Sequence, residues 1–163
     1  MRRTLDSLAR EVAVETGGRA VAADNLHLTL AFLGERPAAI VPELCASAAA
    51  IDGLPFRLSL DDVGCWRKAD IAWLAARRAA QLQELRQHVT NALATLQIVI
   101  DERRFVPHVT LARRTESVIA RQLTPPIEWQ VGSFALVAST LDPRGVRYKV
   151  LRNFALTASD DRP

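Results

Sequence analysis

The stretches "NLHLTLAFLG" (residues 25–34) and "FVPHVTLARR" (residues 105–114) decide how this 163-residue chain folds. Each is a short apolar segment that contains His, one residue, then Thr. Side chains alternate between the two faces of a strand, so His and Thr project from the same face, with roughly 7 Å of rise between them. We therefore expect two strands that each present an imidazole and a hydroxyl together.

The four side chains of this repeated pattern suit chemistry at phosphorus. Histidine has an ordinary pKa near 6.5, so one of His27 and His108 can accept a proton at neutral pH while the other donates one. The hydroxyls of Thr29 and Thr110 can donate hydrogen bonds to phosphoryl oxygens. Facing strands would supply a base, an acid and two phosphate contacts without a metal ion. The competing interpretation, core histidines with backbone partners, explains either motif alone but not the matched pair.

The third histidine, His88 in "QHVTNAL", is also followed two residues later by Thr. It falls within a long helical pattern, where residues two apart point about 200° away from each other. We therefore assign His88 to the flank of a helix.

Hydrophobic periodicity along the rest of the chain predicts an α+β protein. The predicted helices cover residues 4–16, 38–50, 78–96 and 115–123, and the predicted strands cover 26–33, 55–60, 70–75, 98–100, the second motif, and a hairpin of 131–140 with 146–156. Turns are expected at Gly64 and at Asp142-Pro143-Arg144-Gly145. Strands joined by turns and helices indicate antiparallel sheets, and the weak duplication predicts two similar lobes related by an approximate two-fold axis.

Composition limits the classes of protein to which the chain can belong. With 49% hydrophobic residues it can bury the core of a single domain, and it has neither a transmembrane run nor a signal peptide, which predicts a cytoplasmic protein. Cys45 and Cys65 match no zinc or redox spacing. The net charge is +3 and Lys68 and Lys149 are the only lysines, so the positive charge is mostly arginine. Arginine mildly favours a phosphate-bearing partner.

The two motif segments resemble the signature motifs of the 2H phosphoesterase superfamily, and most closely the bacterial and archaeal RNA 2′,3′-cyclic phosphodiesterases, historically called 2′-5′ RNA ligases. The likeness extends through "PFRLSLDDVGCW" and "IAWLA" to the last hairpin. It implies one bilobal domain over residues 1–163, with two antiparallel β-sheets flanked by helices and a central groove. It also implies that neither a metal nor another cofactor is needed.

The resemblance further implies hydrolysis of a terminal 2′,3′-cyclic phosphate of RNA to a 2′-phosphate, with reversible 2′-5′ joining of RNA ends. His27 and His108 become the acid/base pair, and Thr29 and Thr110 the phosphate contacts. The expected partner is RNA with a 2′,3′-cyclic phosphate or a 2′-5′ linkage. Phosphate or sulfate is expected to fit the groove, and members of the family are expected to be monomers.

Two further residues are candidate substrate contacts. Arg113 matches a basic position that follows the family's second motif, although strict alternation from His108 places Arg114 on the motif face instead. A β-bulge or the end of the strand would bring Arg113 to that face, and we favour Arg113. Trp66 is a candidate for stacking on a base, which is worth ~1–3 kcal/mol; the alternative is a tryptophan of the core or rim.

Three alternatives stay open at this point. The first is a phosphodiesterase for a small cyclic nucleotide or an ADP-ribose cyclic phosphate, and the second is a non-catalytic module that binds RNA ends. The third is a two-histidine metal hydrolase using Asp24 and Glu35, which is weaker because both lie at turn positions. Family members usually begin with an apolar strand before the first helix, and this chain begins almost at the helix. We expect the resulting unpaired sheet edge to permit dimerisation.

Overall fold

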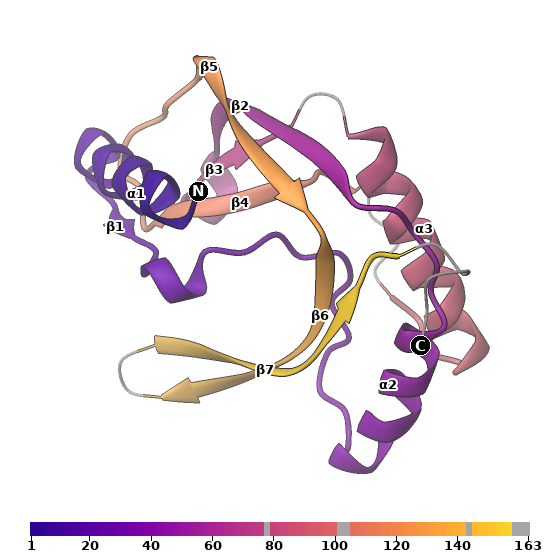
Figure 1. Cartoon of the computed structure of the whole chain (residues 1–163). Helices are drawn as coiled ribbons and strands as arrows, with labels where there is room; N and C mark the ends of the chain where they lie inside the picture. The colour runs from indigo at the N-terminus through magenta and orange to yellow at the C-terminus, as the bar shows by residue number, and fades with distance from the viewer. Residues whose placement is uncertain (77–78, 101–104, 143–144, 158–163) are drawn as a thin grey trace. The chain divides into compact units, whose positions relative to one another are not determined.

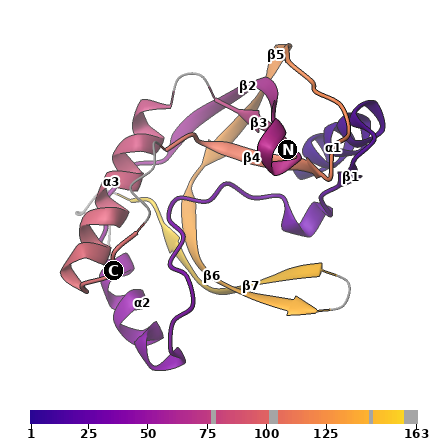
Figure 2. The ribbon, with the colours of Figure 1, turned by 180° about the vertical axis from the view of Figure 1, so that it is seen from behind.

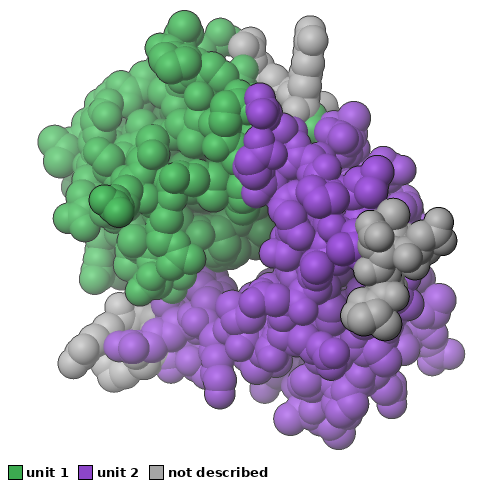
Figure 3. Space-filling model, in the orientation of Figure 1, with its two compact units in different colours: residues 1–29, 58–79, 106–129 green, residues 30–57, 80–105, 130–163 purple. Residues whose placement is uncertain are grey.

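The computed structural model describes residues 1–76, 79–100, 105–142 and 145–157. Its helices are α1 (Arg2–Thr16), α2 (Val41–Ala49) and α3 (Ala80–Thr95). Its strands are β1 (Arg19–Ala20), β2 (Phe56–Trp66), β3 (Ile71–Ala75), β4 (His108–Arg113), β5 (Arg121–Val131), β6 (Ser133–Asp142) and β7 (Gly145–Ala155). The chain forms two compact units (Figure 3), which are described in turn. The mixture of helices with antiparallel sheets confirms the predicted α+β class.

Unit 1 comprises residues 1–29, 58–79 and 106–129 and contains most of a five-stranded sheet. The strand order is β1-β4-β3-β2-β5, and β4 pairs antiparallel with β1 and with β3, as β3 does with β2. Helix α1 lies beside β4 in both views of the ribbon (Figures 1 and 2) and also contacts β1 and β3. One face of this sheet is therefore covered by α1.

The sequence of α1 explains how it packs on the sheet. Leu5, Leu8, Ala9 and Val12 recur at the spacing of one helical stripe and all are buried. Gly17 ends the helix in the left-handed conformation, with a φ of 67°, which glycine adopts without steric cost. The predicted helix over residues 4–16 is thus confirmed, together with its glycine stop.

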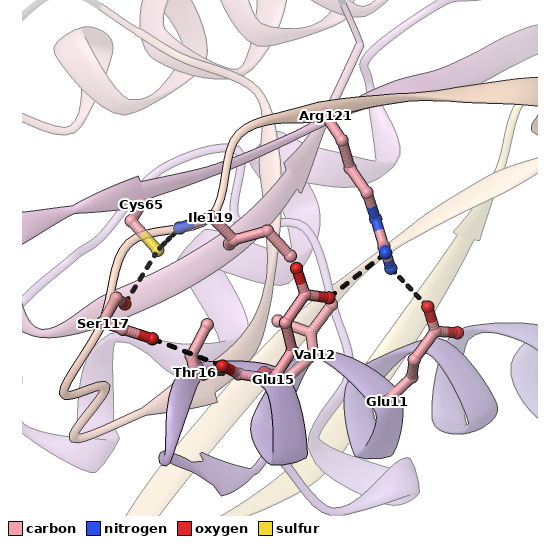
Figure 4. A network of polar contacts seen from close by, with 8 residues as sticks. All are labelled: Glu11, Val12, Glu15, Thr16, Cys65, Ser117, Ile119 and Arg121. Atoms are coloured by element: carbon pink, nitrogen blue, oxygen red, sulfur yellow. Dashed lines mark hydrogen bonds and ion pairs between the residues drawn. The ribbon is translucent and has the colours of Figure 1, made fainter.

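A polar network ties α1 to the segment that leads into β5 (Figure 4). Arg121 makes ion pairs with Glu11 and, at 3.1 Å, with Glu15. The hydroxyl of Ser117 donates to the carbonyl oxygen of Glu15 at 3.3 Å, and the Sγ atom of Cys65 accepts from the backbone N–H of Ile119 at 3.4 Å. These contacts fix the path of residues 115–120 without a helix.

Unit 2 comprises residues 30–57, 80–105 and 130–163. Helices α2 and α3 lie side by side in both views (Figures 1 and 2), and a cluster of Leu44, Leu93 and Ile98 forms a core between them. Pro42 sits in the first turn of α2, where its missing N–H costs least. The helices predicted over 38–50 and 78–96 are confirmed within the described residues.

Strands β6 and β7 form a separate two-stranded antiparallel sheet in unit 2, which confirms the predicted hairpin. Asp142 pairs with Gly145, and the turn residues 143 and 144 lie outside the described residues. The two-fold relation between lobes stays a prediction.

The regular strand predicted over residues 26–33 is wrong. This segment makes one isolated bridge, between Leu28 and Val109, and no ladder. Its apolar alternation also breaks, because Ala31 and Leu33 pack on the core of unit 2 while Phe32 is 73% exposed. The segment passes from one unit to the other after Thr29, so its side chains serve two cores in turn.

Three other predicted elements are wrong as well. Gly64 is not a turn but an interior residue of β2; the chain turns at the 3-10 helix Arg67–Ala69. Residues 98–100 form no strand, because Ile98 packs on the core of unit 2 as an irregular segment. Residues 115–123 form no helix, because the backbone N–H groups of Glu116 and Ser117 donate to the carbonyl oxygen of Thr16 instead.

Among the helices that the structure describes, none combines the length and the apolar character required to cross a membrane.

Candidate active site

The two His-x-Thr segments meet at a single antiparallel bridge. Leu28 of the first motif pairs with Val109 of the second, and both belong to unit 1. Val109 is fully buried, so its neighbours in the chain, His108 and Thr110, project from the opposite face of the sheet. In an antiparallel pair the residues that flank the bridge are neighbours across the strands, with Cβ atoms about 4.5–5.5 Å apart. The two motifs therefore pair directly with each other at this bridge.

This register brings all four motif side chains together on one face. One step from the bridge, His27 lies across from Thr110; one step the other way, Thr29 lies across from His108. The charge of His27 also acts on the pKa of His108, as expected for two imidazoles that share a site. The structure thus gathers the residues that the sequence placed 81 positions apart.

Both imidazoles are held in the same way by the backbone. The Nδ1 atom of His27 lies 2.6 Å from the carbonyl oxygen of Asn25, and that of His108 lies 2.8 Å from the carbonyl oxygen of Val106. A carbonyl oxygen only accepts, so Nδ1–H is the donor in both rings. Each neutral ring then keeps Nε2 as its proton acceptor, and each protonated ring offers Nε2–H.

The environment of His108 lowers its pKa from the ordinary value of 6.5. Burial is the largest cause, because it disfavours the charged ring; the hydrogen bond to Val106 acts in the opposite direction, and the charges of His27 and Arg113 add to the lowering. At neutral pH His108 is therefore a neutral imidazole that can accept a proton.

The indole of Trp66 packs against the His108 ring. The ring of Trp66 meets the imidazole edge to face, with centroids 4.5 Å apart and planes at 76°. The ring of Trp73 also packs against Trp66, at 5.7 Å between centroids. Trp73 itself lies on Gly64, where an added Cβ would come within 2.4 Å of its ring. Gly64 therefore leaves the space that the Trp73 indole occupies, and Trp73 in turn packs against the Trp66 ring beside His108.

A β-bulge decides the position of Arg113. On β3, Trp73 pairs with Thr110 and Ile71 pairs with Arg113, with a register shift between them. Ile71 and Trp73 are two residues apart and share a face, so Arg113 lies on the same face as Thr110 and His108. Arg114 leaves the strand with a φ of 56°. The bulge therefore brings Arg113 to the face of His108 and Thr110. Strict alternation pointed to Arg114 instead because it assumes a strand without a bulge.

Arg19 is a neighbour of the site that the sequence did not reveal. It pairs directly with Arg113 across β1 and β4 and is exposed, as Arg113 is. Strand β1 has only two residues, too few for any alternation to be visible in the sequence. Only the sheet register could have identified it.

The remaining candidates lie elsewhere. His88 is on α3, as predicted, with its Nδ1 atom 3.2 Å from the carbonyl oxygen of Asp52. Asp24 forms an exposed ion pair with Arg2. Within residues 1–76, 79–100, 105–142 and 145–157, no three His, Cys, Asp or Glu side chains cluster in a way that would hold a metal ion.

The fold and the site define an α+β protein in which two His-x-Thr motifs pair beside an antiparallel sheet. A model of the 2′-5′ RNA ligase superfamily matches residues 3–143. The chain belongs to this superfamily.

Named relatives agree with this assignment. The chain is 38% identical over 144 residues to the RNA 2′,3′-cyclic phosphodiesterase of Escherichia coli, with 86% of this chain and 81% of the relative covered. It is 36% identical over 160 residues to the enzyme of the same name from Thermus thermophilus, with 90% and 79% covered. Membership and these relatives make the chain an enzyme, a hydrolase of the phosphodiesterase class.

Solved structures extend the similarity to the fold. A Thermus thermophilus protein matches with a TM-score of 0.83 and 31% identity, covering 97% of this chain and 92% of that one. Escherichia coli LigT complexed with 3′-AMP matches with a TM-score of 0.80 and 33% identity, covering 94% and 92%. The same protein complexed with phosphate has a TM-score of 0.75.

Proposed function

We propose that this protein hydrolyses the terminal 2′,3′-cyclic phosphate of RNA to a 2′-phosphate by two-histidine acid/base catalysis. The bridge between Leu28 and Val109 carries the proposal, because it sets His27 and His108 on one face with a threonine across from each. The names of the relatives support the substrate, and the binding of 3′-AMP and of phosphate by Escherichia coli LigT supports a site for RNA ends.

The lowered pKa of His108 suggests how the two histidines divide the reaction. Neutral His108 takes a proton from water at Nε2 while the water oxygen forms a bond to phosphorus. The bond between phosphorus and the 3′ oxygen breaks, and the Nε2–H of protonated His27 gives its proton to that oxygen. A 2′-phosphomonoester and a free 3′-hydroxyl result, and proton exchange with water restores both rings.

The other candidate residues bind the substrate in this proposal. The hydroxyls of Thr29 and Thr110 donate to the non-bridging phosphoryl oxygens, where negative charge develops. Arg113 supplies a guanidinium on the same face, suited to two phosphate oxygens at once. Trp66, half-buried beside His108, offers an aromatic surface to the terminal base.

The same groups also open the cyclic phosphate with the 5′-hydroxyl of a second RNA as the nucleophile, which leaves a 2′-5′ phosphodiester and a free 3′-hydroxyl. With an RNA hydroxyl in place of water, one histidine deprotonates the attacking oxygen and the other protonates the leaving oxygen. The proposal therefore includes reversible 2′-5′ joining of RNA ends, in keeping with the description of the superfamily.

The test uses an oligonucleotide that ends in a 2′,3′-cyclic phosphate, with EDTA present throughout. We expect conversion to the 2′-phosphate, and a loss of about 10²–10⁴-fold in kcat/KM for His27→Ala and for His108→Ala, the usual contribution of a general acid or base. His88→Ala is the matched control, since His88 also precedes a threonine by two residues but lies on α3. It should keep wild-type turnover.

Each other outcome points to a different alternative. Faster turnover of a mononucleoside 2′,3′-cyclic phosphate or of an ADP-ribose cyclic phosphate than of the oligonucleotide would mean that the substrate is a small nucleotide. Tight binding of the RNA end with no product between pH 5 and 8 would mean a binding module. Activity that survives both single histidine substitutions would contradict the proposed mechanism.

A further inference from the structure

Two arginines face each other at the outer edge of the sheet of unit 1. Arg19 of β1 and Arg113 of β4 are direct partners in an antiparallel register, and both are exposed. Directly opposed residues have Cβ atoms about 4.5–5.5 Å apart, and like charges at such a pair are destabilising. The ion pairs that Arg2, Arg10 and Arg121 make in unit 1 involve neither residue. The pair thus concentrates positive charge that no described carboxylate neutralises.

The backbone holds Arg19 at this place. The chain reverses at Gly17 and Gly18 after α1, and an added Cβ on Gly18 would lie 3.0 Å from the carbonyl oxygen of Arg113. Beyond the pair, the N–H of Val21 donates to the carbonyl oxygen of Leu111 at 2.8 Å. The position of Arg19 is therefore set by close contact of the two backbones on both sides.

The pair lies on the catalytic face. The bulge in the pairing of β3 with β4 sets Arg113 on the side of Thr110 and His108, and the partner register gives Arg19 the same side. Across the bulge, Thr110 and Arg113 lie opposite Trp73 and Ile71, which are two residues apart, or roughly 7 Å along the strand. The charge of Arg113 also reaches His108, where it contributes to the lowered pKa.

We propose that Arg19, directly across from Arg113, extends the phosphate contact of Arg113 to a phosphodiester of the RNA chain next to the reacting phosphate. Two planar guanidiniums offer several N–H donors and match the oxygens of a phosphodiester in pairs. The bound anion would also offset the repulsion between the two charges. This inference rests on the proposed function, and it distinguishes an RNA chain from a mononucleotide as the preferred substrate.

The test compares two substrates: a mononucleoside 2′,3′-cyclic phosphate, and a dinucleotide with the same cyclic end and one internal phosphodiester. For Arg19→Ala we expect kcat/KM on the dinucleotide to fall by about 10- to 100-fold, the cost of losing charged hydrogen bonds. Turnover of the mononucleotide should stay within about two-fold of wild type. Arg19→Lys keeps the positive charge but loses the paired N–H donors of the guanidinium. Its kcat/KM on the dinucleotide should lie between those of wild type and Arg19→Ala.

Two controls separate binding from structure. Arg3→Ala removes one exposed arginine from α1, which packs on the opposite face of the sheet. It should leave kcat/KM unchanged for both substrates. Arg19→Ala should melt no earlier than wild type because it removes a like-charge contact. The dependence of log kcat/KM on log salt should become shallower by about one for the dinucleotide only.

Binding keeps the inference separable from the catalytic proposal. The affinity of the unreactive dinucleotide 3′-phosphate, measured by calorimetry, should fall about 10-fold or more in Arg19→Ala even if wild type turns over neither cyclic substrate. Equal losses on both substrates, or unchanged dinucleotide turnover and affinity, would overturn the arginine-pair site while leaving the histidine mechanism standing.

Discussion

At the scale of the residue, the two motif histidines, His27 and His108, make the same kind of hydrogen bond. Each donates Nδ1–H to the carbonyl oxygen two residues before it, so each presents Nε2 to the face. His108 in addition has Trp66 against its ring, and burial lowers its pKa. Packing by one aromatic side chain therefore prepares one of two similar imidazoles to accept a proton.

Replacing Trp66 tests this role. Trp66→Ala would hydrate His108, so the pKa of His108 should rise towards 6.5 and the acidic limb of the kcat/KM profile should move to higher pH. Trp66→Phe keeps an aromatic ring beside His108, so the pKa of His108 should stay nearly as low as in wild type. NMR titration of the His108 ring measures the pKa directly, and Trp129→Ala on β5 is the matched control. A raised KM with an unmoved acidic limb would mean that Trp66 binds the base and does not tune His108.

At the scale of the element, β2 and β3 are adapted to support the aromatic rings. Trp73 pairs with Gly64 across the two strands, and its indole occupies the space above that glycine. A glycine inside a strand usually weakens it and marks a close approach by another group. Here the approaching group is Trp73, and the support continues through Trp66 to His108.

Gly64→Ala should therefore destabilise the protein. The added methyl group would overlap Trp73, and overpacking of this kind costs about 1–3 kcal/mol of unfolding free energy. The control is Gly132→Ala, where an added Cβ meets nothing within 4 Å. Denaturant unfolding checks both variants. The double variant Gly64→Ala, Trp73→Ala should lose less free energy of unfolding than the two single variants lose together. Strict additivity of the two losses would show that the ring and the methyl group do not compete for space.

At the scale of the whole molecule, the lowered pKa of His108 couples folding to pH. In the unfolded chain this ring has its ordinary pKa of about 6.5, so above that pH it is neutral in both states and has no effect. As the pH falls below 6.5, the unfolded chain takes up the proton first, which lowers the free energy of unfolding until the folded ring is protonated too.

Thermal unfolding of wild type and His108→Gln between pH 5 and 8 measures this contribution. We expect the melting temperature of wild type to decline more steeply below pH 6.5 than that of the variant. The carboxylates titrate in both proteins and cancel in the comparison. Parallel curves would mean that His108 has the same pKa folded and unfolded.

The sequence by itself determined the local and repeated features of this protein. The stripe of Leu5, Leu8 and Val12 with the glycine stop predicted α1, the alternating final segments predicted the β6–β7 hairpin, and the matched motifs singled out His27 and His108. Each of these depends on residues close in the chain, where helix and strand periods are direct consequences of backbone geometry.

The tertiary structure alone decided which segments meet and in what register. The bridge of Leu28 with Val109, the bulge that turns Arg113 to the histidine face and the pairing of Arg113 with Arg19 all join residues distant in the chain. A shift of register by one residue moves a side chain to the other face of a sheet, and no local pattern encodes that choice. It is settled by packing against α1 and Trp73, which exists only once the sheet has formed.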